Sequence, residues 1–463
     1  MRIAMIGAGY VGLVSGACFA DFGHRVTCVD KDAVKIAALQ RGEIPIFEPG
    51  LEDLVKSSVK ARRLDFTTDL AGSVGSADAV FIAVGTPARR GDGYADLSYV
   101  YAAAREIATA IKGFTVVITK STVPVGTGDE VEALIRETNS SADFAVASNP
   151  EFLREGAAIR DFKLPDRIIV GTNDERARKL IEDIYRPLYL NRAPIMHTER
   201  RTAELIKYAA NAFLATKITF INEIADLAEK VSVDVNDVAR GIGLDNRIGS
   251  KFLHAGPGFG GSCFPKDTRA LIRTAQDHGV TLRLVESVLA VNDSRKRAMA
   301  RRVAAALGGN LRGKSIGILG LTFKPDTDDM REAPSLSLIA GLQDQGAIVR
   351  AYDPVGMEQA RRELPSIEYC RDAYACAQGV DALVIVTEWS QFRALDLARL
   401  RSEMAKPIII DLRNIYPPAE MAQAGFIYES IGRPPVHHEL IPLILNDNTS
   451  TLNTVSEGQH RSG

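Results

Sequence analysis

Residues 2–30 read RIAMIGAGYVGLVSGACFADFGHRVTCVD, and this stretch decides the fold. An aliphatic run ends in Gly7-Ala8-Gly9-Tyr10-Val11-Gly12, a helical pattern follows, and a second aliphatic run ends at Asp30. This order is typical of a βαβ unit, whose glycine turn lets backbone N–H groups approach a pyrophosphate at a helix N-terminus. Asp30 would accept hydrogen bonds from the adenosine ribose and repel a 2′-phosphate. The stretch therefore predicts a Rossmann domain that binds NAD, although Lys31 and Lys35 leave NADP open and a turn without a ligand is the alternative.

The alternation of strands and helices continues along the chain. Further aliphatic runs lie at 79–84, 115–119, 144–147 and 168–170. Runs of this kind between helical stretches predict a parallel sheet with helices on both faces.

The same pattern returns near the C-terminus. Residues 315–320 repeat the first strand and its turn, and Gly346-x-x-Val349-x-x-x-Asp353 has the spacing of Gly23-x-x-Val26-x-x-x-Asp30. In a third repeat, residues 380–386 match residues 77–83. These repeats predict an α/β fold with two Rossmann-like, doubly wound parallel-sheet domains.

A helical domain is expected between the two halves, because no strand pattern is convincing there. Residues 199–231 contain no glycine or proline and favour one long spine helix, which would offer a dimer face. The predicted division is 1–197 for NAD binding, 198–307 for the central helices, 308–440 for the second Rossmann-like domain and 441–463 for a flexible polar tail.

Composition limits the classes of function. The net charge is −2 and no basic tract stands out, so binding to nucleic acid or to an anionic membrane surface is not expected. The five cysteines are scattered and form no metal-type cluster, which favours a reduced cytoplasmic protein without a metal. The glycines of the first helix argue against a signal peptide or membrane span.

The octapeptide Gly260-Gly261-Ser262-Cys263-Phe264-Pro265-Lys266-Asp267 carries the strongest chemical signal. It sets one cysteine in a Gly/Pro-rich turn, where Pro265 could begin a helix. A nearby cation and a helix N-terminus favour the reactive thiolate. A small buried residue is the alternative interpretation.

Several polar residues follow predicted strands, where ligands gather in an open parallel sheet. Thr86 and Thr122 are candidates for cofactor or substrate hydroxyls, or they cap helices. Glu151 and Glu155 follow the run at 144–147 and include a candidate general base, although solvated surface charge is the usual interpretation.

The long helix carries a second candidate cluster. Glu204, Lys207, Tyr208 and Asn211 share one face by their spacing. Lys207 could stabilise a developing oxyanion, or it could extend its ammonium to water from an amphipathic helix.

These motifs together resemble the UDP-glucose 6-dehydrogenases, nucleotide-sugar dehydrogenases of the UDP-glucose/GDP-mannose dehydrogenase family. The resemblance runs from Met1 to about Pro435, and the octapeptide and residues 323–332 (FKPDTDDMRE) look like family signatures. It implies NAD-dependent oxidation of UDP-glucose to UDP-glucuronate in two steps, through a cysteine thiohemiacetal and thioester. Sister enzymes for GDP-mannose or a UDP-N-acetylhexosamine remain the alternative.

The resemblance also implies roles for single residues. Cys263 would attack an aldehyde, Lys207 and Asn211 would bind the C6 oxygen, and Asp267 would assist proton transfer. Glu151 would be the general base, with Thr122 orienting the water.

The resemblance further implies two sets of binding residues and a homodimer, with higher assemblies left open. The cofactor set is Gly7, Gly9, Val11, Gly12, Asp30, Lys35, Thr86, Thr122, Glu155, Lys266 and Arg331. The nucleotide-sugar set is Glu151, Phe152, Leu153, Arg154, Glu155, Lys207, Asn211, Arg247, Phe252, Leu253, His254, Ala255, Gly256, Gly260, Lys324 and Arg413. Arg247 would reach into the site of the neighbouring subunit.

Two other classes fit parts of the sequence. A β-hydroxyacid dehydrogenase shares an N-terminal Rossmann unit and a helix lysine, but it needs neither Cys263 nor the second half. A non-catalytic NAD sensor would not need the thiol, the lysine and both carboxylates.

Overall fold

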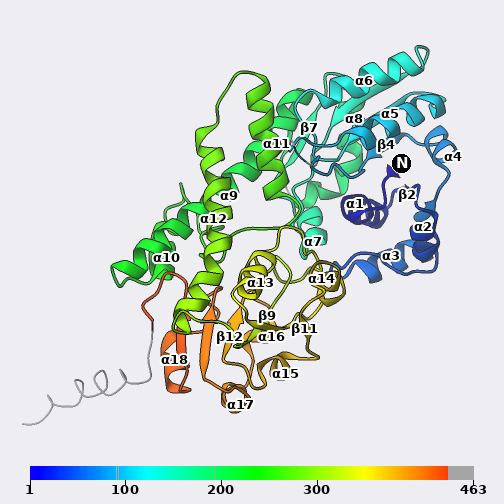
Figure 1. The fold of residues 1–463 in the computed structure, drawn as a ribbon. Coiled ribbons are helices and arrows are strands. Elements are labelled where there is room, and N and C mark those ends of the chain that lie inside the picture. The colour runs from blue at the N-terminus through cyan, green and yellow to red at the C-terminus, as the bar shows by residue number, and fades with distance from the viewer. Residues whose placement is uncertain (90, 92, 192, 436–463) are drawn as a thin grey trace, which may run out of the picture.

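Strand β1 (Arg2–Ile6) ends at a glycine turn, and helix α1 (Tyr10–Asp21) follows it, as the opening sequence predicts. A computed structural model describes residues 1–89, 91, 93–191 and 193–435 of the chain. Figure 1 shows an N-terminal sheet domain and a C-terminal sheet domain, with long green helices running between them. The predicted polar tail, 441–463, lies outside the described residues, and the domain limits stay predictions.

The N-terminal sheet has eight strands in the order β3-β2-β1-β4-β5-β6-β7-β8. Aliphatic side chains cover both faces, which is why the central strands are continuous apolar runs. The strands after β1 are β2 (Arg25–Val29), β3 (Leu64–Thr67), β4 (Ala79–Ile82), β5 (Thr115–Thr119), β6 (Phe144–Ser148), β7 (Ile168–Gly171) and β8 (Ile195–Thr198). The helices after α1 are α2 (Ala33–Gln40), α3 (Leu51–Lys60), α4 (Leu70–Gly75), α5 (Ser98–Ala110), α6 (Thr127–Thr138), α7 (Ala158–Lys163) and α8 (Glu175–Tyr185), before the 3₁₀ helix η1 (Arg186–Asn191).

One join departs from the parallel arrangement. Strands β6 and β7 meet antiparallel through Ser148 and Gly171, and the Thr172 hydroxyl donates to the Val146 carbonyl oxygen at 3.1 Å. Apolar runs carry no mark of strand direction, so the sequence predicts the strands and not this reversal.

The central region is helical and contains α9 (Arg200–Lys230), α10 (Val235–Gly243), α11 (Phe264–Asp277) and α12 (Arg283–Ala306). The long helix predicted at 199–231 is confirmed, with Glu199 and Val231 as its caps. No helix in the described part of the chain is long and apolar enough to cross a membrane.

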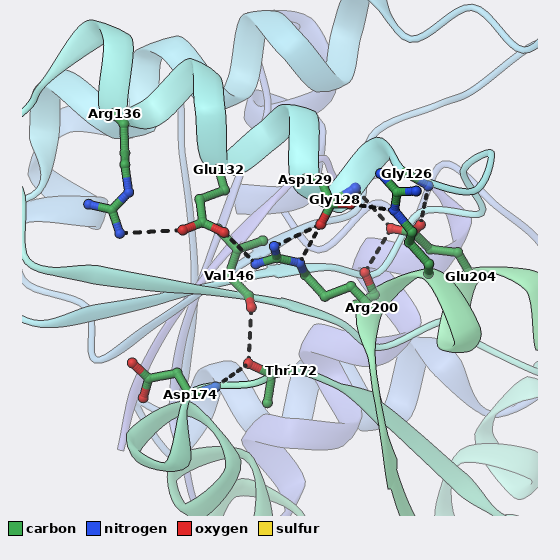
Figure 2. A network of polar contacts seen from close by, with 12 residues as sticks. Gly126, Gly128, Asp129, Glu132, Arg136, Val146, Thr172, Asp174, Arg200 and Glu204 are labelled. Carbon is green, nitrogen blue, oxygen red and sulfur yellow. Dashed lines mark hydrogen bonds and ion pairs between the residues drawn. The ribbon is translucent and has the colours of Figure 1, made fainter.

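Polar contacts fix the start of α9 against the N-terminal sheet (Figure 2). The Glu204 carboxylate accepts hydrogen bonds from Gly126 N at 2.7 Å, Gly128 N at 2.9 Å and the Ser148 hydroxyl at 2.9 Å. Arg200 pairs with Asp129 at 2.7 Å. A buried carboxylate at the first turn of α6 satisfies N–H groups that have no partner within the helix. Helix α9 is therefore held beside the carboxyl edge of β5 and β6.

The second sheet is parallel throughout, in the order β11-β10-β9-β12-β13-β14. Its strands are β9 (Ser315–Leu319), β10 (Ile348–Tyr352), β11 (Glu368–Tyr369), β12 (Ala382–Ile385), β13 (Ile408–Asp411) and β14 (Ile427–Ser430). Its helices are α13 (Pro334–Asp344), α14 (Met357–Glu363), α15 (Ala373–Ala377), α16 (Ser390–Arg393), α17 (Leu397–Glu403) and α18 (Pro418–Gln423). The repeat in the sequence thus corresponds to a second doubly wound domain.

Candidate active site

Cys263 lies at the N-cap of α11, and Pro265 is in the first turn of that helix. The thiol is half-buried, whereas the other four cysteines are buried. Burial raises the pKa of the Cys263 thiol to about 11, and the Glu151 charge adds to the rise while Lys207 opposes it. The sequence favours a thiolate at this position, but in this buried setting the free enzyme holds a neutral thiol at neutral pH.

Lys207 lies on the buried face of α9, which excludes the interpretation in which its ammonium extends to water. Its ammonium is 3.1 Å from Glu151 Oε1, and both side chains are at most 5% exposed. Burial works to lower the pKa of Lys207, but the charges of Glu151, Cys263 and Asp267 outweigh burial and raise it. Lys207 is therefore a fixed cation beside the thiol.

Asp267 joins the two helices that carry these groups. It is fully buried, accepts from Asn211 Nδ2 on α9 at 2.7 Å and pairs with Lys266 Nζ at 2.6 Å. Because Asp267 is one turn beyond Cys263 on α11, these contacts set the thiol against Lys207 and Asn211.

Glu155 connects the N-terminal domain to the segment before α13. Its carboxylate accepts from the hydroxyls of Ser262 at 3.2 Å and Thr327 at 3.3 Å, and it lies 3.4 Å from the Arg331 guanidinium. Burial, with the nearby Asp329 charge, raises the pKa of Glu155 to about 7. Lys324 belongs to the same cluster, because the charges of Glu155 and Cys263 act on it. They oppose the lowering of its pKa that burial causes.

Thr122 and Thr86 meet at the strand ends, where the Thr86 hydroxyl donates to the Thr122 carbonyl oxygen at 2.9 Å. Thr122 also borders a small cavity together with Lys207. The remaining lining residues are Thr119, Ser121, Val123, Ser148, Pro150 and Glu204.

The turn after β1 has room for a ligand at one of its three glycines. A Cβ on Gly7 would lie 2.6 Å from the Ala83 carbonyl oxygen, and one on Gly12 would lie 1.8 Å from the Gly7 carbonyl oxygen. Gly9 has no protein atom within 4 Å of the position where a Cβ would lie. Packing therefore requires Gly7 and Gly12, while Gly9 leaves space for a pyrophosphate.

Asp30 faces this turn. Its carboxylate accepts from Ala8 N at 2.9 Å and from Lys35 Nζ at 3.0 Å. Val11, another residue of the predicted cofactor set, is half-buried at the start of α1. An acidic residue beside the turn fits the ribose hydroxyls of a dinucleotide. The residues present therefore fit NAD.

The segment 252–260 is clamped by side chains of α9 and α12. The Asn222 side chain accepts from Gly256 N at 2.8 Å, and Arg295 Nε donates to the Gly256 carbonyl oxygen at 2.6 Å. From the second domain, Arg413 approaches so closely that a Cβ on Gly256 would lie 3.2 Å from its Nη1. Within the segment Leu253, Ala255 and Gly260 are buried, Phe252 is half-buried and His254 is exposed.

Phe152, Leu153 and Arg154 each contact different partners. The Phe152 ring lies between two cations, 3.7 Å from Arg167 and 5.2 Å from Lys207 Nζ. Leu153 N donates to Glu151 Oε2 at 2.5 Å. Arg154 instead pairs with Asp161 on α7 at 2.6 Å.

Arg247 is the candidate residue that lies apart from this cluster. Its side chain is 89% exposed and pairs with Asp245 at 2.6 Å. Within one chain, therefore, it contributes nothing to the site around Cys263.

The second domain uses its equivalent acidic residue differently. Asp353 is 1% exposed and accepts from Leu321 N at 2.7 Å, Gly356 N at 2.7 Å and Trp389 Nε1 at 3.2 Å. No cluster of His, Cys, Asp or Glu suited to a metal is found within the described residues.

Three family models match the chain in sequence. They describe the NAD binding domain, the central domain and the UDP binding domain of the UDP-glucose/GDP-mannose dehydrogenase family, and they match residues 1–189, 201–294 and 317–418. The chain belongs to this family. Its cofactor is NAD, and it is an NAD-dependent oxidoreductase of the UDP-glucose dehydrogenase type.

Individual family members are similar over almost the whole chain. A UDP-glucose 6-dehydrogenase of Rhizobium meliloti is 67% identical over 94% of this chain and all of its own length. One of Pseudomonas aeruginosa is 47% identical over 95% of this chain and 99% of its length. A solved UDP-glucose dehydrogenase of Pyrobaculum islandicum has a TM-score of 0.86 and 41% identity, covering 92% of this chain and 96% of that one.

Some residues that build the site are not in the predicted sets. Ser262 touches both Glu155 and the Cys263 sulfur, at 3.2 and 3.4 Å. The Asn292 side chain accepts from Phe259 N at 2.8 Å and donates to the Phe259 carbonyl oxygen at 3.1 Å. Asn292 is buried on α12 together with Arg295 and Lys296, and no motif in the sequence points to it.

Replacing Asp30 by alanine should raise KM for NAD⁺ about tenfold to a hundredfold, because a charged ribose acceptor is lost. Discrimination against NADP⁺ should relax as well. Steady-state kinetics with both cofactors measures this, and Asp32→Ala is the matched control because Asp32 caps α2 through Val34 N and Lys35 N. Unchanged KM values for both cofactors in Asp30→Ala would contradict the assignment.

Proposed function

We propose that this enzyme oxidises the C6 hydroxymethyl group of UDP-glucose to the carboxylate of UDP-glucuronate. The observation that supports it is the grouping of a thiol, a fixed cation, an amide and a carboxylate, contributed by Cys263, Lys207, Asn211 and Glu151, within one buried cluster. The 67% identical relative named UDP-glucose 6-dehydrogenase supports the choice of sugar.

In the first oxidation Lys207 and Asn211 hold the C6 oxygen. The Lys207 charge stabilises the oxygen as its proton leaves, and Asp267 assists that transfer directly or through a water molecule. NAD⁺ held beside Gly9 and Asp30 would supply the hydride acceptor, one molecule for each of the two oxidations.

In the second stage the Cys263 sulfur adds to the aldehyde to give a thiohemiacetal. Its oxidation gives a thioester, and water then releases the acid. In the thiohemiacetal oxidation the Lys207 charge again stabilises the oxygen as its proton leaves, assisted by Asp267, and in the hydrolysis Glu151 takes the proton from the water, which Thr122 orients. The neutral thiol of the free enzyme must lose its proton as it attacks, and the adjacent Lys207 charge favours that loss.

A panel of nucleotide sugars tests this function. Purified enzyme is incubated with UDP-glucose, GDP-mannose or a UDP-N-acetylhexosamine, each with NAD⁺ and with NADP⁺, and the products are separated by chromatography. We expect UDP-glucuronate and two NADH for each UDP-glucose. Preferential oxidation of another sugar would assign the chain to a sister activity with the same chemistry.

We also propose a homodimer built on α9. Phe213, Phe220 and Leu227 recur every seven residues on that helix and are 66, 49 and 57% exposed. An exposed apolar stripe of this kind is typical of a protein interface. Arg247, which is exposed in the single chain, would then complete the site of the neighbouring subunit.

Replacing Arg247 by alanine should raise KM for UDP-glucose about tenfold or more, because a charged contact to the phosphates is lost. Mixed with Cys263→Ala protein, it should regain part of the activity, since the heterodimer then holds one intact composite site. Arg240→Ala is the control, because Arg240 is also exposed and pairs with Asp237. No recovery, with subunit exchange confirmed by mass, would argue against a shared site.

A further inference from the structure

Lys120 is a buried cation for which the proposed chemistry has no role. It follows β5 and is 4% exposed. Its ammonium donates to Asn149 Oδ1 at 3.0 Å and to the Tyr185 hydroxyl oxygen at 3.1 Å. The rings of Phe162 and Tyr185 lie 5.9 and 5.8 Å away. Throughout the part of the chain described here, no carboxylate forms an ion pair with Lys120.

A buried ammonium without a carboxylate partner is costly to maintain. Taking a charge out of water is unfavourable, and neutral hydrogen-bond partners offset only part of that. A methionine would fill the same space beside Phe162 and Tyr185 without that cost. Buried charges of this kind cluster at functional sites, which directs attention to what Lys120 holds.

Lys120 holds the turn that carries the proposed base. Asn149 begins this turn, and its side chain also donates to the Ile169 carbonyl oxygen at 2.7 Å and accepts from the Tyr185 hydroxyl at 2.7 Å. Asn149 N donates to the Thr119 carbonyl oxygen at 2.9 Å. The turn is thus bonded to β5, β7 and α8, and the residue two positions on is Glu151.

The charge of Lys120 also acts on Glu151. Burial lowers the pKa of Lys120 to about 8, with the Glu151 charge opposing that change and the Lys207 charge adding to it. Tyr185 is the titratable group in direct contact, and burial raises its pKa. Because electrostatic attraction is mutual, the Lys120 ammonium also attracts the Glu151 carboxylate.

We propose that Lys120 is the positioning residue for Glu151. Its two hydrogen bonds, to Asn149 and Tyr185, fix the Asn149-Pro150-Glu151 turn, and its positive charge acts with that of Lys207 to hold the Glu151 carboxylate in place. This inference rests on the base role proposed above for Glu151.

Lys120→Met in the full-length enzyme tests the inference. We expect kcat to fall about tenfold or more, with KM for the sugar changed less than about twofold. Thermal stability should stay the same or rise, since a desolvated charge is removed.

Two further variants complete the comparison. Tyr185→Phe removes one of the two acceptors of the Lys120 ammonium and keeps the charge and the ring, so it should lower kcat less than Lys120→Met does. Lys314→Met is the control, because Lys314 is a half-buried lysine that donates to the Leu307 carbonyl oxygen at 2.7 Å in a distant region. It should leave kcat and KM unchanged.

A wild-type kcat in Lys120→Met would overturn the inference. So would a loss of thermal stability that parallels a loss of kcat and a rise in KM, since that marks a structural role only. If Lys120→Met does not fold, Lys120→Gln keeps a donor to Asn149 without the charge, and the same two outcomes apply to it.

The sugar that the wild-type enzyme oxidises in the panel is the substrate for all these measurements. Turnover of another sugar changes the proposed substrate but not this inference. If Glu151→Gln shows the base role and Lys120→Met behaves as wild type, the Lys120 inference alone fails. If no sugar in the panel is oxidised, both proposals fail.

Discussion

Cys263→Ser should lower the rate of UDP-glucuronate formation by at least about a thousandfold. A serine hydroxyl has a far higher pKa than a thiol, so it adds poorly to the aldehyde and forms no thioester. Any NADH that this variant produces should stop at one equivalent per sugar, because the first oxidation does not need the sulfur. Product analysis beside NADH absorbance measures both quantities.

Cys370→Ser is the control for this experiment. Cys370 is a buried thiol of the second domain, packed near β11 away from Lys207, and its replacement should leave turnover intact. Sustained four-electron oxidation by Cys263→Ser at a tenth of the wild-type rate or more would rule out the covalent route.

Glu151→Gln should produce a burst of NADH and then lower steady turnover about a hundredfold to ten-thousandfold. The amide cannot take a proton from the attacking water, so the thioester forms and persists. Intact-mass spectrometry should find a UDP-glucuronyl adduct, and peptide mapping should locate it on Cys263.

Glu155→Gln is the control for the Glu151→Gln experiment. Glu155 contacts Ser262, Thr327 and Arg331 and not Lys207, so its replacement should weaken cofactor binding without accumulating an adduct. Steady turnover by Glu151→Gln, or an adduct on another cysteine, would be incompatible with the proposed division of roles.

The elements with strong periodicity were predictable from sequence. The first βαβ unit, the long helix α9 and strands β9, β10 and β12 of the second sheet follow from apolar runs, glycines and helix formers. Strands β3 and β8 are not among the predicted runs, because they are four residues long and half of each is polar or exposed.

The site was predictable only where a motif marks it. The turn around Cys263 is recognisable, and the resemblance to a known family brought Lys207 and Asp267 together across 60 residues of sequence. Lys120 follows a strand in a way that suits a surface residue equally well, and only the fold reveals that Asn149 and Tyr185 enclose it. The state of the thiol also depends on burial, which no local pattern encodes.

The burial of Asp353 bears on the number of NAD molecules that one chain binds. Its sequence context repeats that of Asp30, so motifs alone would give two dinucleotide sites per polypeptide. Backbone and indole N–H groups already occupy its oxygen atoms, leaving no free acceptor for a ribose. The stoichiometry should be one NAD per chain, because in the second copy of the fold this carboxylate holds backbone and indole N–H groups instead of a ligand.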